Sequence, residues 1–409
     1  MFSEKYASLD GQVSEILENV ETPSEERVKD ILEKSKTERL ELSEVAELLE
    51  VGDDKTFNLL RDFTIDNFRK PKGNELRNIS PIYLSSYCVD TCGYCQFSAN
   101  RKDTQRTRLS LSQLEEEVSA VIDEGNHVIE FTLATDPEFT PQKLAEYIAK
   151  TKELLGDREG SGILLCSDHL TQEAYRELKS AGLCGVVQWD ETLDKVQYMK
   201  WHGQSPRKKH FEERMDNHDR AMGEGLEVAT GVLFGLADFR YDVLMQIAKA
   251  RHLEEEYDRK PFIFGTPRIK PIGGRILHPK HEVSDGRYET ALMVYKIAEP
   301  EIVRWLQTRE TLELNFRNML DGDVYTYRCG EVKPGGYFVN KRTIDSCKGG
   351  QFNVNELERK SFESMLRDTS FSVNYAWIRE DNLIRFNHLF SPNSKLTPAF
   401  SEGTSSVVE

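Results

Sequence analysis

The spacing of apolar residues changes once along the chain, near residue 75. Up to that point apolar positions recur every three to four residues, which predicts amphipathic helices and no strand. After a break with proline and glycine at 70–74, short apolar runs of strand length alternate with segments of helix length. The predicted strands cover residues 82–85, 127–133, 163–166, 185–189, 228–234, 262–264, 302–306 and 324–327. Eight such βαβ-type units predict an α/β fold with a (β/α)8 TIM-type barrel, closed or nearly closed, behind an N-terminal helical extension.

The same pattern divides the chain into three parts. Residues 1–75 form the helical extension, 76–370 the barrel, and 371–409 a C-terminal extension that is partly mobile because its last residues are rich in Ser, Pro and Thr. Ser43 is predicted to cap a helix of the first part, and Ser112 to cap the helix after the first strand. Catalytic residues of such barrels lie in the loops that follow the strands, so reactive side chains are expected there.

Charge and composition exclude several classes of partner. The formal net charge is −16, and a chain this acidic repels phosphate backbones, which argues against nucleic acid. No apolar run reaches the length of a membrane span, and the first ten residues lack the apolar core of a secretory signal. These features predict a cytoplasmic protein in a reducing compartment. There, closely spaced cysteines are more often metal ligands or catalytic groups than disulfide partners.

Three of the seven cysteines stand within eight residues, directly after the first strand. Cys88, Cys92 and Cys95 have the spacing C-x3-C-x2-C, and Gly93 lets the backbone turn tightly between them. Three thiolates on one short loop can hold three irons of a 4Fe–4S cubane and leave the fourth iron open. The alternatives are a structural zinc site or three unrelated cysteines. Zinc usually takes four protein ligands, and no second cysteine pair with matching spacing is visible.

This spacing, with Tyr94 before the last cysteine, resembles the radical S-adenosylmethionine (SAM) superfamily. The resemblance implies one 4Fe–4S cluster whose open iron chelates SAM. One electron, from a donor such as flavodoxin or ferredoxin, then cleaves SAM to methionine and a 5′-deoxyadenosyl radical, which abstracts hydrogen from a small-molecule substrate.

Further motifs resemble one branch of that superfamily, the aromatic amino acid lyases. These include 2-iminoacetate synthase, a tyrosine lyase of hydrogenase-cofactor assembly and the tryptophan lyase 3-methyl-2-indolic acid synthase. The resemblance implies carbon–carbon cleavage of an amino-acid-like substrate. The matching stretches are Ile82–Cys88, Asp219–Ala221, Gly231–Leu236, Pro267–Pro271, Thr308–Glu310, Pro334–Tyr337 and Gln351–Phe352.

The resemblance also implies residues that bind SAM. Tyr94 lies near the adenine, and Thr135 and Asp136 accept hydrogen bonds from the ammonium group. Glu191 accepts from the ribose hydroxyls, and the guanidinium of Arg214 pairs with the methionyl carboxylate. Each has an ordinary alternative: Asp136 as a helix cap, Glu191 as a solvated loop acid, and Arg214 as a helix-surface arginine.

The substrate side of the site follows the last strands. Arg309 matches the arginine that holds the substrate carboxylate, and its alternative is a salt bridge with Glu310. The family usually has Ser-Ala-Gly-Ser where this chain has the sequence 327–330, Tyr-Arg-Cys-Gly. Tyr327 is therefore a candidate catalytic residue if it points inward, or a packing residue if it does not. This departure leaves the substrate open.

Three other functions remain possible from the sequence. A biotin-synthase-like or rearrangement enzyme of the same superfamily would act on a non-aromatic substrate. An iron–sulfur electron-transfer protein would use the cluster without SAM, and a structural protein would carry no cluster. Outside the motifs, Lys208 is interpreted as part of a solvated helix face and Cys166 as a buried core thiol.

Overall fold

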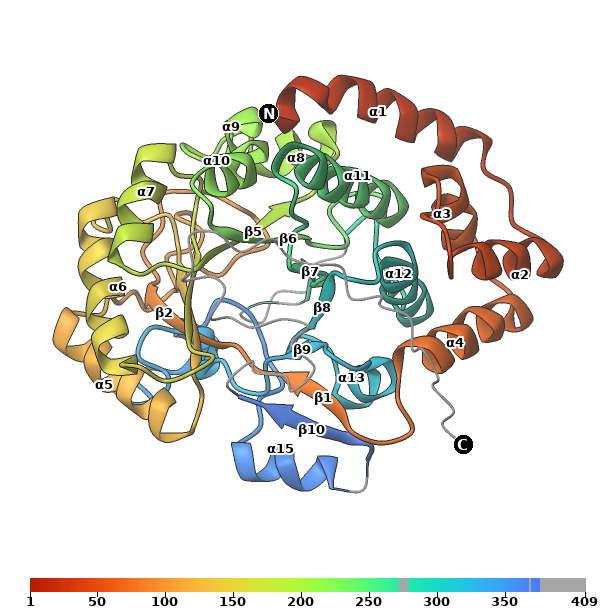
Figure 1. Cartoon of the computed structure of the whole chain (residues 1–409). Coiled ribbons are helices and arrows are strands. Elements are labelled where there is room, and N and C mark those ends of the chain that lie inside the picture. The colour runs from red at the N-terminus through yellow and green to blue at the C-terminus, as the bar shows by residue number, and fades with distance from the viewer. Residues whose placement is uncertain (271, 273–278, 368, 376–409) are drawn as a thin grey trace.

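The computed structural model describes residues 1–270, 272, 279–367 and 369–375, and its centre is one sheet of ten parallel strands. The sheet curls round a central axis with helices on its outside (Figure 1). Its strand order is β10-β1-β9-β8-β7-β6-β5-β4-β3-β2, so β2 and β10 are the edges. The strands are β1 (Asn74–Arg77), β2 (Ser80–Ser85), β3 (Val128–Leu133), β4 (Gly162–Cys166), β5 (Gly185–Glu191), β6 (Glu227–Val232), β7 (Ile263–Gly265), β8 (Val303–Leu306), β9 (Val324–Tyr325) and β10 (Phe371–Asn374).

The helices fall into an N-terminal group and a group that alternates with the strands. The first group is α1 (Phe2–Asn19), α2 (Glu25–Lys34), α3 (Leu42–Leu49) and α4 (Asp54–Phe68). The second is α5 (Leu111–Asp123), α6 (Pro141–Leu155), α7 (Gln172–Ala181), α8 (Lys195–His202), α9 (Phe211–Met215), α10 (Asn217–Gly223), α11 (Phe239–Tyr257), α12 (Asp285–Ala298), α13 (Leu312–Asn318), α14 (Ser346–Gly349) and α15 (Arg359–Leu366), with a 3-10 turn, η1, at Gly330–Val332. In the described part of the chain, no helix is both long and apolar enough to cross a membrane.

Alternate residues of each strand serve two different cores. On β3, Ile129 and Phe131 pack outward with buried residues of the surrounding helices, whereas Val128 joins an inner layer with Leu164 and Val187. Successive side chains of a strand point to opposite faces, so a strand buried on both faces is apolar along its length. This is why the strands were visible in the sequence as short apolar runs. β2 to β9 confirm the eight predicted strands and the predicted barrel-like fold.

Two further strands, β1 and β10, extend the sheet beyond these eight. β10 pairs with β1 in register from Phe371 beside Asn74 to Asn374 beside Arg77. The predicted boundaries at 75/76 and 370/371 therefore fall within β1 and at the start of β10. Residues 376–409, which include the predicted mobile tail, lie outside the described residues.

The N-terminal helices pack on the outside of α11 and α12 (Figure 1). Their apolar faces join the buried core of these helices, with Phe2 of α1 fully buried. The backbone of Phe2 also donates to Asp219 at 3.2 Å. The predicted helical extension is thus part of the same packed body as the barrel.

Both predicted helix caps were placed two residues too late. α3 begins after Glu41, whose backbone N–H donates to Glu44 at 2.9 Å, so Ser43 lies inside the helix. α5 begins after Ser110, which forms a capping box with Gln113, and not after Ser112. At Ser110 the capping box satisfies two backbone donors that the helix itself leaves free.

Candidate active site

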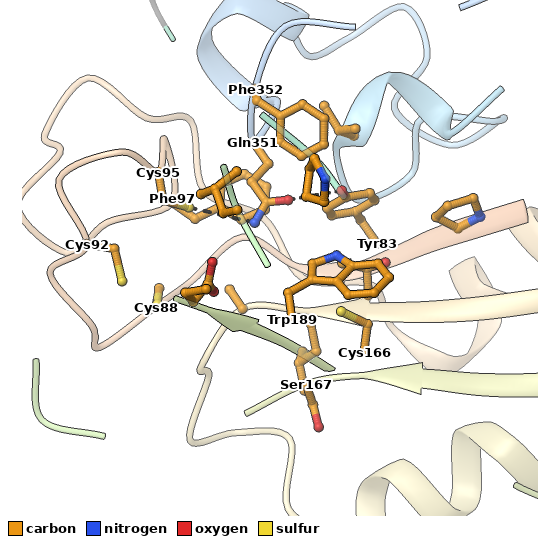
Figure 2. A pocket seen from close by; sticks show the side chains of 18 of the residues that line it. Tyr83, Cys88, Cys92, Cys95, Phe97, Cys166, Ser167, Trp189, Gln351 and Phe352 are labelled. Carbon is orange, nitrogen blue, oxygen red and sulfur yellow. Dashed lines mark hydrogen bonds between the residues drawn. The ribbon is translucent and has the colours of Figure 1, made fainter. Parts of the chain in front are cut away.

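The three cysteines lie on the loop after β2 and line a cavity at the carboxyl ends of the strands. Figure 2 shows Cys88, Cys92 and Cys95 at one side of this cavity, with Trp189 and Cys166 on neighbouring strands. The backbone of this loop is withdrawn from water, so its polar groups need hydrogen-bond partners elsewhere in the protein. These come from neighbouring segments of the chain.

Asp90 joins the cysteine loop to two other loops. One of its carboxylate oxygens accepts from the backbone N–H of Arg207 at 3.0 Å and of Lys208 at 3.2 Å. The other accepts from the hydroxyl of Thr135 at 2.7 Å. Thr91 adds a bond from its N–H to the Ser205 hydroxyl at 3.0 Å. The cysteine loop is therefore held between the end of β3 and the segment that joins α8 to α9.

The three thiols need a metal centre that stabilises their ionised form. Burial raises the pKa of Cys88 and of Cys92 to about 11, so the thiolates need a cationic centre to stabilise them. Gln351 donates to the sulfur of Cys95 at 3.7 Å. In the described part of the chain no three His, Cys, Asp or Glu side chains converge on one point as a mononuclear metal site does. Three separated thiolates fit three different irons of a cubane.

Tyr94 closes the outer side of the loop. Its hydroxyl shares a hydrogen bond of 2.7 Å with Nε2 of His202, and its ring meets Trp201 edge to face. Burial lowers the pKa of His202 to about 3, so the imidazole is neutral. Because Nδ1 of His202 must donate to the carbonyl of Tyr198, Nε2 accepts and Tyr94 donates. Tyr94 is thereby fixed against the cavity wall.

Glu191 and Arg214 meet in a buried charged network. Arg214 donates to Asp168 at 3.1 Å and to the carbonyl of Trp189 at 2.6 Å, and it lies 3.6 Å from Glu191. Burial opposes the ionised form of Glu191, but Lys208 and Arg214 outweigh it and lower the pKa of Glu191 to about 2. All four charged side chains line the cavity. The alternatives of a solvated loop acid and a surface arginine are thus wrong.

Lys208 was missed by sequence reasoning. The sequence indicated a solvated helix face, but Lys208 lies in a loop, largely buried, and its ammonium group contacts Glu191. The run of three basic residues at 208–210 gave no sign of this, because only the fold brings Glu191 to one of them.

Thr135 and Asp136 separate at the end of β3. Thr135 lines the cavity, but Asp136 does not. The carboxylate of Asp136 accepts from Arg108 at 2.6 and 2.9 Å and from the N–H of Glu138 at 3.2 Å. The prediction that Asp136 binds the ammonium group of SAM is therefore wrong, because its oxygens are used by these donors outside the cavity.

Arg309 has no carboxylate partner within 4 Å among the described residues, although it lines the cavity. The alternative pair with Glu310 does not form, because Glu310 is bound by Arg268 and Lys270. The guanidinium lies over the ring of Phe352 at 3.6 Å, and its Nε has no hydrogen-bond partner. Burial lowers the pKa of Arg309, which shows that its charge is poorly compensated.

Tyr327 does not line the cavity. Its ring stacks on Phe362 with centroids 5.3 Å apart, and its hydroxyl bonds with Asn126 at 3.1 Å. The prediction that Tyr327 is catalytic is therefore wrong, and the packing alternative is right. Cys329, two residues on, does line the cavity, with its sulfur 2.9 Å from Glu356.

The inner end of the cavity contains residues that the sequence did not single out. Trp189 and Trp305 meet edge to face at 5.5 Å, and Glu130 and Cys166 line the space beside them. The sequence shows only that these residues alternate along predicted strands and so share one face of the sheet. This alternation does not distinguish the wall of a cavity from a filled core. Cys166, interpreted as a core thiol, in fact borders the cavity.

Comparison with known proteins assigns one part of the chain to a family. Residues 82–249 match the family described as "Radical SAM superfamily". This part of the chain is a radical SAM domain. It contains the cysteine loop, Glu191 and Arg214, and the cofactors of the superfamily are a 4Fe–4S cluster and SAM.

Individual relatives and solved structures show which members of this superfamily the chain is similar to. The chain is 26% identical to 2-iminoacetate synthase of Escherichia coli over 279 residues, which are 68% of this chain and 72% of that protein. The crystal structure of HydG, a maturase of the [FeFe]-hydrogenase, superposes with a TM-score of 0.81 at 25% identity, covering 90% of this chain and 80% of that one. The structure of methylornithine synthase (PylB) shares the fold, with a TM-score of 0.65 at 19% identity over 84% of this chain and 97% of that one.

Proposed function

We propose that the protein is a radical SAM lyase that cleaves a carbon–carbon bond of an amino-acid-like substrate. The observation that carries the proposal is Arg309, a guanidinium without a carboxylate partner among the described residues, inside the cavity that the cysteines border. Such a group is costly to bury unless a ligand neutralises it, and a planar guanidinium suits a carboxylate. The similarity to 2-iminoacetate synthase supports the same substrate class.

The residues of the chain divide the task between them. Cys88, Cys92 and Cys95 would hold the cluster, which when bound with SAM supplies a 5′-deoxyadenosyl radical by one-electron cleavage. Glu191 would bind the ribose and Arg214 the methionyl carboxylate, and the two side chains hold each other in position.

At the substrate end, Arg309 would fix the carboxylate of the amino acid. Phe352 holds the guanidinium plane from one side. Trp189 and Trp305 form an apolar inner wall against which a side chain can pack. Fixing one end of a small substrate in this way gives a reactive bond one orientation, which is worth orders of magnitude in rate.

Anaerobic turnover tests the proposal. The reconstituted protein is incubated with dithionite, SAM and each of a panel of amino acids, and 5′-deoxyadenosine and side-chain fragments are measured by mass spectrometry. We expect 5′-deoxyadenosine to rise with one amino acid, together with a fragment of its side chain. Cys92→Ala should abolish both products while the protein stays folded. An isomer of the substrate without a fragment would show a rearrangement enzyme and contradict the lyase.

A further inference from the structure

Glu130 is a buried carboxyl group in the cavity that the steps above do not use. It lies in the middle of β3 and is 4% exposed. Residues 130, 132 and 134 line the cavity, whereas Ile129 and Phe131 pack against the helices. This alternation places the Glu130 side chain on the inner face of the sheet.

No basic side chain of the described chain pairs with Glu130. Among the described residues, the thiol of Cys166 is the side chain that hydrogen-bonds with Glu130, and burial raises the pKa of Glu130 to about 8. A thiol is a weak donor and leaves most of the hydrogen-bonding capacity of a carboxyl group unused. A buried polar group in this condition is costly unless a partner arrives from outside the chain.

Glu130 and Arg309 are complementary but do not meet. Both line the cavity, and they are not within 4 Å of each other. Both influence the phenol of Tyr83. Burial raises the pKa of Tyr83, the charge of Glu130 raises it further, and the charge of Arg309 lowers it. The cavity therefore has an uncompensated cation and an uncompensated carboxyl group with space between them.

The depth of Glu130 decides which part of a substrate it meets. Thr135, at the cysteine loop, stands five residues beyond Glu130 and two residues beyond the end of β3. Arg309 lies in the loop after β8, beyond the carboxyl end of that strand. A substrate whose carboxylate is held by Arg309 thus reaches Glu130 with the end of its side chain.

We propose that Glu130 determines specificity by binding an N–H or O–H group at the end of the substrate side chain. This rests on the proposed function and narrows it: the substrate is an amino acid whose side chain ends in a hydrogen-bond donor. The aromatic wall of Trp189 and Trp305 packs against the part between the two ends. An all-apolar side chain would leave Glu130 without a partner, which a buried site rejects strongly.

The test uses pairs of amino acids that differ only in the terminal group. L-tyrosine is compared with L-phenylalanine, and L-ornithine with L-norvaline, in the reconstituted holoenzyme with SAM. We expect the polar member of one pair to be preferred about 100-fold or more in kcat/KM. Glu130→Leu should raise KM for that member at least about tenfold and remove the preference. Glu130→Gln should keep it for a phenol and lose it for an ammonium group.

A matched control separates specificity from folding. Asp242 is also a fully buried carboxyl group, but it lies on α11 outside the cavity. Asp242→Asn should leave the preference between the two members unchanged. Thermal midpoint and iron content of each variant are measured, and only variants that match the wild type are compared.

Calorimetric measurement of the binding of the same amino acids tests the role of Glu130 independently of turnover. Tighter binding of the polar member to the wild type than to Glu130→Leu supports the inference even if no fragment is released, which would refute only the lyase. Equal affinities, binding of neither pair, or an unchanged preference in Glu130→Leu would overturn the inference, and lyase activity could persist without it.

Discussion

Of the two arginines that line the cavity, Arg309 differs from Arg214 in having no carboxylate partner in the described chain. We predict that Arg309→Gln raises KM for the amino acid at least about tenfold, because a charge-assisted bond to the carboxylate is lost. Cleavage of SAM without substrate should persist. Steady-state kinetics of 5′-deoxyadenosine formation measure both effects.

Arg268→Gln is the matched control for this prediction. Arg268 binds Glu310 and Asp285 outside the cavity, so its loss should lower stability and leave KM near the wild-type value. If Arg309→Gln changed the thermal midpoint but not KM, Arg309 would be a structural residue and the substrate role would be lost.

Single residues show what the sequence can and cannot reveal about this site. The spacing of Cys88, Cys92 and Cys95 is local, so the sequence alone is enough to predict a metal-binding loop there. Lys208 and Glu130 were not found, because their significance depends on a fold that buries them beside distant residues. The prediction for Tyr327 failed for the same reason. The direction of a side chain just beyond a short strand depends on tertiary packing, here on Phe362.

At the scale of elements, the inner strands are shaped by Trp189. Its indole crosses β6 and β7, where a Cβ at Gly231 would lie 2.2 Å from the ring and 2.6 Å from the carbonyl oxygen of Gly265. We predict that Gly231→Ala lowers the free energy of unfolding by about 1–3 kcal/mol and weakens substrate binding, because the displaced ring also lines the cavity.

Gly11→Ala provides the control for this change. Gly11 lies within α1, and a Cβ there meets nothing within 4 Å. Alanine should stabilise the helix by about 0.5–1 kcal/mol without affecting binding. Denaturant unfolding measures the stability of the two variants, and calorimetry measures their substrate binding. Equal changes in both variants would show that the Trp189 ring does not determine the shape of the cavity.

The elements that the sequence predicted share one property. β2 to β9 each contain a short apolar run, because both faces of the sheet are buried, and such a run is visible locally. β1, with the sequence Asn-Glu-Leu-Arg, and β10, Phe-Ser-Val-Asn, have no such run. They are strands because each pairs with the other across nearly 300 residues, and such a long-range pairing leaves no periodic signal in either segment.

For the whole molecule, buried acids link stability to pH. Asp242 accepts from the N–H of Leu193 and the hydroxyl of Thr192, both at 2.8 Å, but its second oxygen has no partner. Burial raises the pKa of Asp242 to about 8, with Asp194 and Asp238 adding to the effect. Glu191 acts oppositely: its lowered pKa contributes stability that is complete above its ordinary range, near pH 4.5. Between pH 5 and 8, therefore, Asp242 titrates and Glu191 does not.

The sign of the Asp242 effect follows from proton counting. In this range the folded protein keeps a proton on Asp242 that the unfolded chain has released, so stability falls as pH rises, at most by about 1.4 kcal/mol per pH unit. Neutral histidines such as His202 act in the opposite sense, so the wild-type curve alone does not isolate one acid. The difference between wild type and Asp242→Asn does, because asparagine has no such proton. We predict that, from pH 5.5 to pH 7.5, the free energy of unfolding of the variant rises by about 1–2 kcal/mol relative to that of the wild type. Denaturant unfolding at the two pH values measures this difference. A difference independent of pH would mean that Asp242 is ionised in the folded protein, with its second oxygen stabilised by water or a cation.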